Sequence, residues 1–345
     1  MGRTALFLVM GLGMAMGFIG FQMYRSGQQA ADQQYAYLKY MNARNLARAA
    51  VHATLRAYDR DSIPPTEGTD VSFNQGVYRI DSLRATGDTL RMVTTGVYAE
   101  SSYTMRLTLF RTTRPFPSVN AAIGIRASPV NFTMTGAQSE VNGNNWSEDG
   151  STLVGSGDLP GVTSMTSADS ASILAAGAGR IYGSVAVSKD TSTPNPASYI
   201  DEYIANADYI FTSGTVSGNR TFGSSSDPVI VICDSPADTN YSVRFQGNVT
   251  GYGILAVRGN LVLGGTFNWY GLVICFGESN SVEFGGNGSP GIVGGLIVAQ
   301  PGSGSASLTL KGSGNQGKVK YSSASLERAR NIDRLRYYTI LDWYE

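Results

Sequence analysis

A long uncharged segment at the amino end constrains this chain more than any other feature. Residues Thr4 to Tyr24 read TALFLVMGLGMAMGFIGFQMY and contain no charged residue. A helix of about 20 apolar residues crosses the ~30 Å hydrocarbon core of a bilayer. The short side with Arg3 favours the cytoplasm, which places the residues after Arg25 outside. A cleaved secretory signal is the alternative, but Phe18 and Ile19 stand where such a signal needs polar residues. The segment therefore predicts an uncleaved membrane anchor.

The helical pattern continues beyond the apolar run. No loop signal appears until Ile63-Pro64-Pro65, and Arg44, Arg48 and Arg56 lie off one face of a 3.6-residue period. This predicts one continuous helix from Thr4 to Asp59, about 84 Å long at about 1.5 Å per residue. The second half is amphipathic, and we expect its stripe through Leu46, Ala49, Ala53 and Ala57 to lie against a globular domain. The full stripe consists of Ala31, Tyr35, Leu38, Asn42, Leu46, Ala49, Ala53 and Ala57.

The apolar half is rich in glycine, with residues at Gly11, Gly13, Gly17 and Gly20. Gly13 and Gly17 have the small-xxx-small spacing that lets membrane helices approach closely. Each glycine also weakens a helix by about 1 kcal/mol relative to alanine, so the same stretch is where we expect the helix to melt outside lipid. Glycine is also simply common in membrane helices, and that alternative stays open.

Composition argues against catalysis and against nucleic-acid binding. Lysine plus arginine number 26 and aspartate plus glutamate number 26, so the net charge is zero. One histidine, His52, and two cysteines leave almost nothing from which to build a nucleophile pair or a metal cage. We expect no enzyme activity, no metal and no cofactor. The one enzyme class that the fold below permits is polysaccharide cleavage by carboxylates, for which the candidates are Asp234, Asp238, Glu278 and Glu283.

Two kinds of β pattern follow the helix. From Phe73 to Thr113 apolar and polar residues alternate, most clearly at Met105, Leu107 and Leu109. Turn signals at 85–88 and 100–102 divide this segment into three runs, which predicts a small antiparallel meander packed on the helix stripe.

The segment from Pro117 onward predicts a repetitive body. Four apolar runs between turn formers superpose as one template, and shorter alternating strands lie between them, which is typical of a solenoid. We interpret residues 117–322 as a parallel β-helix-like domain; a β-sandwich is the alternative. The four runs are Pro228-VIVIC, Gly253-ILAVR, Gly271-LVICF and Gly295-LIVAQ, and the shorter strands are Val243-Arg-Phe, Leu261-Val-Leu, Val282-Glu-Phe and Leu308-Thr-Leu.

The template makes a prediction about the two cysteines. It places Cys233 in the fifth slot and Cys275 in the fourth, so the two side chains point to opposite faces. They also lie two rungs apart, about 10 Å, whereas a disulfide needs Cα atoms about 4.4 to 6.8 Å apart. The sequence thus predicts two free thiols, with Cys275 in the core.

The carboxy-terminal segment, 323–345, is expected to form a helix and a strand that cover the body. Ser323 or Ser325 can cap the helix. Arg328, Arg330, Arg334 and Arg336 are interrupted by acidic residues and indicate a solvated helix face rather than a phosphate site.

Both ends of the chain carry a family resemblance. The opening, Arg3-Thr4-Ala5-Leu6 through Arg25-Ser26-Gly27, resembles type IV pilins and pseudopilins, and within them the PilX-type group. The ending, from Tyr321 to the Leu-Asp-Trp close, is similar to PilX-type proteins with β-helical bodies. Most major pilins carry a glutamate at mature position five, whereas the first acidic residue here is Asp32, which leaves open a bulk or a minor tip subunit.

The resemblance implies a function for each part. The apolar helix waits in the inner membrane and then packs with its copies in the core of an extracellular filament at the cell surface, with help from pilus assembly machinery. The implied core residues are Ala5, Leu6, Leu8, Val9, Leu12, Met16, Phe18, Ile19 and Phe21. The expected fold is α+β and mostly β, with a helix over 1–62, a meander over 63–116, the body over 117–322 and the cover over 323–345. A monomeric membrane-anchored adhesin or glycan-binding protein is the alternative, and the surface ligand is open.

Overall fold

The structure, a computed structural model, divides into two compact units. Residues Met1–Thr112 and Tyr337–Glu345 form the first, which we call the head unit, and Thr113–Arg336 form the second, the body unit. The described residues are 2–59, 66–136, 138–212, 214–235, 241–278, 280–285, 291–302, 304–311 and 318–344, with side chains described from residue 6 onward. The predicted break at Pro64-Pro65 lies outside these residues.

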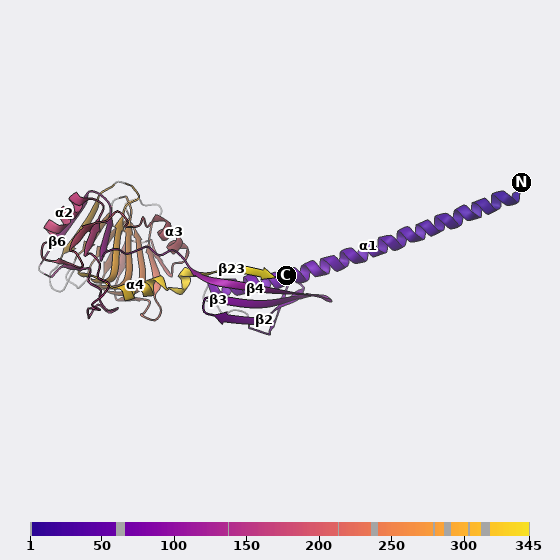
Figure 1. The fold of residues 1–345 in the computed structure, drawn as a ribbon, viewed down its shortest axis with the longest axis horizontal. Coiled ribbons are helices and arrows are strands. Elements are labelled where there is room, and N and C mark those ends of the chain that lie inside the picture. Colours follow the sequence, from indigo (N-terminus) through magenta and orange to yellow (C-terminus); the bar gives the residue numbers. More distant parts are fainter. Residues whose placement is uncertain are drawn as a thin grey trace. The chain divides into compact units, whose positions relative to one another are not determined.

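One helix opens the chain, as the sequence predicts. Helix α1 runs from Gly2 to Asp59 without interruption (Figure 1). The part from Leu6 to Tyr58 is long and apolar enough to cross a membrane, and its most apolar window has a mean hydropathy of 1.8 with none of it buried in the molecule.

The head unit contains an antiparallel sheet that includes the end of the chain. The strand order is β1-β2-β3-β4-β23, and the pairings of β1 with β2, β2 with β3 and β3 with β4 are antiparallel. Both predicted turns form. The first lies at Gly87 and Asp88, and the second lies at Ala99 and Glu100, so Ser101 and Ser102 already belong to β4. The bounds are Asp70–Phe73, Gly76–Thr86, Thr89–Tyr98, Ser101–Thr113 and Arg336–Tyr344.

Small side chains let α1 lie close to this sheet. Ala43, Ala47 and Val51 pack with the inward residues of β3 and β4, which include the predicted Met105, Leu107 and Leu109. Thr94 of β3 donates its hydroxyl to the Ala47 carbonyl at 3.2 Å. Gly96 lies beside it, and a methyl group there would overlap the Ala43 carbonyl oxygen and the Ala47 nitrogen. Glycine at 96 is therefore what permits this distance between helix and sheet.

The buried face of α1 is rotated from the expected stripe. Leu46 and Ala57 are buried, but Ala49 and Ala53 are only half-buried, and the upstream stripe residues Ala31, Tyr35 and Leu38 are exposed. The buried line instead consists of Ala43, Leu46, Ala47, Ala50, Val51, Thr54 and Ala57. The two faces are adjacent, both are rich in alanine and they share Leu46 and Ala57, so the sequence pattern does not choose between them.

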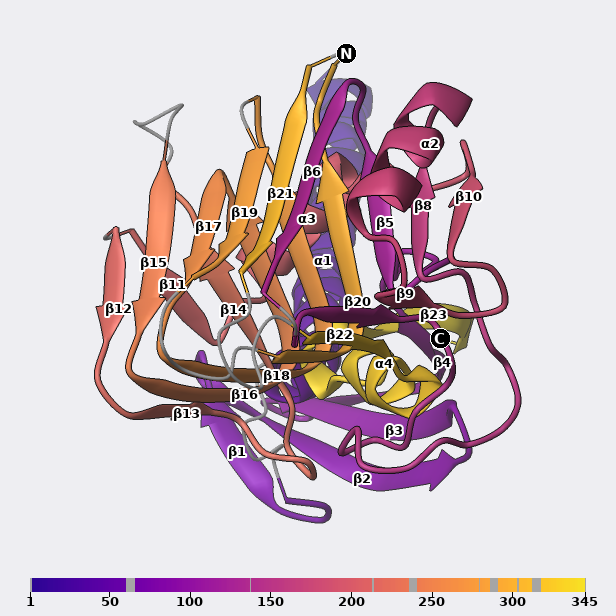
Figure 2. The same ribbon diagram turned by 90° about the vertical axis from the view of Figure 1, so that its left-hand side faces the viewer.

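The body unit is built from two parallel sheets. All pairings between its described named strands are parallel. Figure 2 shows the strands of the smaller sheet, β12-β15-β17-β19-β21-β6, side by side. Its strands are β6 (Val130–Thr135), β12 (Thr215–Ser217), β15 (Ser242–Gln246), β17 (Asn260–Leu263), β19 (Asn280–Phe284) and β21 (Ala306–Lys311).

The larger sheet follows the order β10-β8-β5-β20-β18-β16-β14-β11, with β13, β22, β7 and β9 attached beside it. Parallel neighbours do not fit the β-sandwich alternative, which needs hairpins between successive strands. Its strands are β5 (Ile123–Arg126), β7 (Glu140–Asn142), β8 (Val162–Ser164), β9 (Ile181–Tyr182), β10 (Val187–Lys189), β11 (Tyr209–Phe211), β13 (Arg220–Phe222), β14 (Val229–Cys233), β16 (Asn248–Arg258), β18 (Thr266–Phe276), β20 (Gly291–Ala299) and β22 (Lys318–Tyr321).

The short strands of the repeat align as the sequence predicts. Val243, Leu261, Val282 and Leu308 occupy one register position in four consecutive strands of the smaller sheet. All four are buried in the single large core of the body unit. The alternation of apolar and polar residues in these strands gives an unambiguous register, because a slip by one residue would bury the polar face.

The four longer apolar runs align differently from the predicted template. In three of the runs the shared position is a glycine with positive φ, namely Gly253, Gly271 and Gly294, and in the fourth it is Val229. At each of these glycines a side chain would overlap backbone of the neighbouring strand. The template used Gly295 instead of Gly294, and it also placed the Val229 run one residue out of register. In the Gly294-Gly295 pair the sequence does not show which residue takes the strained conformation.

This register corrects the expectation that the cysteines point to opposite faces. Cys233 pairs with Val257, and Val257 pairs with Cys275, so both thiols lie at one register position and share one face. One strand separates them, which still places them about 10 Å apart. Both are buried free thiols. The distance alone keeps them from bridging.

We expect both thiols to be unreactive in the folded protein. Neither has exposed surface, and burial raises the pKa of each thiol, so the reactive thiolate is scarce at neutral pH. Iodoacetamide should modify neither cysteine in the native protein and both after unfolding in guanidinium, as counted by mass spectrometry. Fast modification of the native protein, or a disulfide in the unreduced sample, would contradict the expected arrangement.

Helices cover parts of the body unit. Helix α2 (Ser167–Ala176) contacts β6, β8 and β10, and α3 (Ala197–Ala205) contacts β14. Helix α4 (Ser323–Arg330) is capped by Ser322 and lies on β16, β18 and β20, followed by a short 3-10 turn at Asp333–Leu335. The expected covering strand, β23, instead extends the head sheet.

Candidate functional sites: the apolar helix and a surface groove

The first candidate site is the apolar half of α1. Its large side chains are exposed in the isolated chain, with Leu6 at 63%, Phe18 at 64% and Ile19 at 57%. The other predicted core residues with described side chains, Leu8, Val9, Leu12, Met16 and Phe21, are likewise exposed. The Ala5 side chain lies outside the described part of the chain. So much continuous apolar surface requires a lipid or protein partner.

The glycines of this segment contact nothing in their own chain. A Cβ atom built at Gly11, Gly13, Gly17 or Gly20 would meet no atom within 4 Å. The helix continues through all four, so melting remains a prediction about another environment. Larger residues therefore fit at all four positions within one chain, and packing inside the molecule does not require glycine there.

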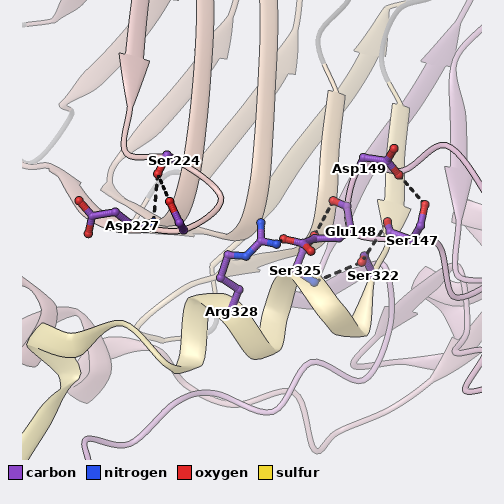
Figure 3. Close-up of polar contacts among 9 residues, drawn as sticks. Ser147, Glu148, Asp149, Ser224, Asp227, Ser322, Ser325 and Arg328 are labelled. Carbon is purple, nitrogen blue, oxygen red and sulfur yellow. Dashed lines mark hydrogen bonds and ion pairs between the residues drawn. The ribbon is translucent and has the colours of Figure 1, made fainter.

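The second candidate site is a groove of about 430 Å³ on the body unit. Four parts of the chain line it: the loop after β7, the loop between β13 and β14, the outer row of β16 and β18, and helix α4. Figure 3 shows the two loops and α4. The lining residues are Ser147, Glu148, Asp149, Ser225, Tyr252, Tyr270 and Arg328.

One wall of the groove is aromatic. Tyr252 and Tyr270 are in register on β16 and β18, and their rings stack with centroids 4.9 Å apart and planes at 15°. Both side chains are half-buried. Neither hydroxyl has a hydrogen-bond partner among the described residues. The wall thus offers two donor and acceptor groups beside an apolar ring surface.

The opposite wall is a loop tied to α4 and β22. The Trp146 amide donates to the Tyr321 carbonyl at 2.9 Å. Ser325 of α4 donates its hydroxyl to the Glu148 carbonyl at 2.9 Å, and Lys320 donates its ammonium to the Gly150 carbonyl at 2.7 Å. Lys320 also lies 3.6 Å from the centre of the Trp146 ring. These contacts attach the loop to α4 and β22 on both sides of Glu148.

The charged groups of the groove are partly neutralised. Arg328 forms an ion pair with Glu148 (Figure 3). Asp149 accepts hydrogen bonds at one oxygen from the Ser147 hydroxyl at 2.6 Å and from the Ser151 amide at 3.0 Å. These hydrogen bonds lower the pKa of Asp149 to about 2, and the bond from Ser147 has the largest effect. The Asp149 carboxylate is therefore ionised at neutral pH. The groove therefore has one excess negative charge.

The residues considered for catalysis do not gather in a shared site. Asp234 is buried and lies 3.4 Å from Arg258, and Glu283 forms an ion pair with Lys311. Glu278 and His52 are exposed, and Asp238 lies outside the described residues. No group of three or more metal-binding side chains occurs in the part of the chain that the structure describes.

Sequence reasoning missed the groove, although it considered two of its parts. The arginines of the last helix were expected on a solvated face, but Arg328 pairs with Glu148, and Arg334 pairs with Asp208 at 2.5 Å. The tyrosines carry the available signal, because Tyr252 and Tyr270 each precede the glycine of an apolar run by one residue. Nothing in the sequence pattern links either tyrosine to the loop at 147–149.

The chain is similar in part to a solved pilin structure. No protein-family model matches the chain, and no curated protein matches it. Among solved structures, it is similar to the crystal structure of the competence-associated pilin ComZ from Thermus thermophilus, with 12% sequence identity and a TM-score of 0.24. The alignment covers 89% of this chain and 97% of that chain. A likeness of this extent does not establish a shared fold.

Proposed function

We propose that this protein is a structural subunit of an extracellular type IV pilus-like filament of the PilX-type group. Its apolar helix forms the filament core with copies of itself, and the β-rich body lies on the outside at the cell surface. Before assembly the same helix anchors the chain in the inner membrane, and pilus assembly machinery extracts it. The role is structural, without catalysis or cofactor.

The observation that carries this proposal is that one unbroken helix is exposed and apolar in its first half and packed on the head sheet in its second half. Residues Leu6 to Tyr24 expose apolar side chains all round, while 43–57 bury small residues against the head sheet. An ordinary membrane anchor needs no rigid connection of this kind. A filament subunit needs such a rigid connection, because the packing of the helices in the core must fix where the folded part of each copy lies.

We also propose that the body unit is a parallel β-helix. Apolar runs and short strands alternate between the two parallel sheets. Each pairs in register with its equivalent in the next repeat, as Ile254 does with Leu272 in the larger sheet and Leu261 with Val282 in the smaller one. Stacked coils of this kind bury a continuous core with few charged residues. Such a body displays a large, rigid outer surface on each copy.

The rival function is a monomeric membrane-anchored adhesin or glycan-binding protein. It uses the same apolar helix as a permanent anchor, and the groove on the body unit is the observation in its favour. The two functions differ in where the mature chain is found. An adhesin stays in the membrane, whereas a filament subunit leaves it.

Electron microscopy of sheared cell-surface material tests the proposal. We expect fibres that bind antibodies raised against this polypeptide, and we expect the chain in the sheared fraction by immunoblotting. Cells lacking the gene are the control for antibody specificity. Recovery of the chain only from detergent-extracted membranes would contradict the filament function and favour the adhesin.

A further inference from the structure

The groove on the body unit has the chemistry of a ligand site rather than of a structural junction. Its polar groups exceed what the fold needs, because the two tyrosine hydroxyls and the second oxygen of Asp149 have no hydrogen-bond partner among the described residues. The two tyrosines are half-buried and Asp149 is exposed, so all three polar groups are open to a ligand or to water. The volume of about 430 Å³ lies in the range of small-molecule sites.

The position of Asp149 is built into the fold. Gly150 follows it with a φ of +69°, and a side chain there would lie 2.8 Å from a methyl group of Val293. Val293 is the register partner of Tyr270 on the next strand. The turn therefore sits directly on the row that carries the tyrosines, and it fixes the carboxylate beside them.

The charges exclude several ligand classes. Two carboxylates face one guanidinium, and Glu148 already pairs with that guanidinium, so a phosphate or another anion would meet an ionised Asp149. A purely apolar ligand would leave the tyrosine hydroxyls and Asp149 unsatisfied. A neutral ligand rich in hydroxyl groups satisfies both conditions. Its hydroxyls donate to Asp149 and bond to the tyrosines, and its C–H faces pack on the aromatic rings.

We propose that this groove binds a neutral saccharide, with Tyr252 and Tyr270 as the stacking wall and Asp149 as the hydroxyl acceptor. Arg328 holds the Glu148 side of the loop in place and adds donors at the rim. The proposal goes beyond the filament function and does not rest on it, since a single chain contains the whole groove.

Saccharide titration of the full chain tests the proposal. The chain is solubilised in a detergent without a sugar head group, and maltotriose, cellotriose, chitotriose and mannotriose are titrated one at a time, with saturation-transfer NMR as the readout. We expect at least one of them to receive magnetisation from the protein. Tyr270→Ser and Asp149→Asn should each weaken that binding by tenfold or more, because each removes a contact that the wild-type groove provides.

The chain offers a matched control in Tyr182→Ser. Tyr182 lies in the same register row as Tyr270, four strands away through Val293, Lys320 and Asn142, which is about 19 Å. It is exposed, and its loss should leave binding unchanged. Tyr252→Phe keeps the ring and removes one hydroxyl, so it serves if Tyr270→Ser unfolds the body. Binding of none of the four saccharides, or equal binding by the groove variants and the control, overturns the proposal. Either result leaves the sheared-fibre experiment unaffected.

Discussion

Gly96→Val should separate helix α1 from the head sheet. A valine side chain at 96 would overlap the Ala43 carbonyl oxygen and the Ala47 nitrogen. Both are backbone atoms of the helix, so they cannot move aside by a change of rotamer as a side chain can. Overpacking of a core typically costs 1–3 kcal/mol, and we expect the upper part of that range or more because backbone is involved. Hydrogen exchange with mass spectrometry should show lost protection in 40–57 and 76–113, whereas strands β14, β16, β18 and β20 of the body unit stay protected.

Gly27→Val is the matched control for this change. Gly27 belongs to the same helix, and a Cβ atom there meets nothing within 4 Å. The same glycine-to-valine replacement should leave protection of the head unit unchanged. If Gly96→Val also leaves 40–57 fully protected, the close approach of helix and sheet at Gly96 is not a feature of the protein in solution.

The double variant Gly13→Leu, Gly17→Leu should abolish filaments without affecting the single chain. Neither position has a neighbour within its own molecule, and leucine favours both the helix and the lipid. Close approach of two helices at these positions becomes impossible, however, and the same loss recurs at every subunit of a polymer. We expect the amount of chain in the sheared fraction to fall at least tenfold, with the membrane pool unchanged or increased, by immunoblotting of both fractions.

Met10→Leu, Met14→Leu is the control for this pair. It places two leucines in the same segment at the same spacing and replaces residues that are already large and exposed. Filaments should persist. Normal filament amounts in the glycine variant would show that the filament core does not use the Gly13–Gly17 face, and the glycines would then reflect only their general frequency in membrane helices.

The sequence predicted well those parts in which the pattern has one solution. The uncharged run, the missing loop signals and the alternation at Met105, Leu107 and Leu109 each leave a single secondary structure consistent with the burial of apolar groups. The short strands around Val243 and Leu261 are similar, because every slip of one residue exposes the core.

In other parts of the chain the sequence pattern fits more than one arrangement. The alanine-rich stripe of α1 has two adjacent faces, and the Gly294-Gly295 pair gives two registers, of which the crowded backbone selects one. The order of the strands in the larger sheet could not be predicted from the sequence either. Ile123, near the start of the body unit, pairs with Leu296 near its end, so β5 lies beside β20 in one sheet. No local periodicity reports such a return.

The groove could not be predicted from the sequence either, because its residues come from distant parts of the chain. Tyr252 and Tyr270 are separated from Asp149 by more of the chain than any motif covers, and Arg328 comes from yet another segment. Only the parallel register and the hydrogen bonds from α4 to the loop bring them together. A site assembled in this way leaves no spacing signature in the sequence.

The body unit has two covalent links to the head sheet, since the chain enters it from β4 and leaves it into β23, neighbouring strands of one sheet. Just inside the body unit these two segments are joined, because the Arg114 amide donates to the Leu335 carbonyl at 2.6 Å. A force applied to the body unit would therefore be carried by two neighbouring strands of the head sheet rather than by one.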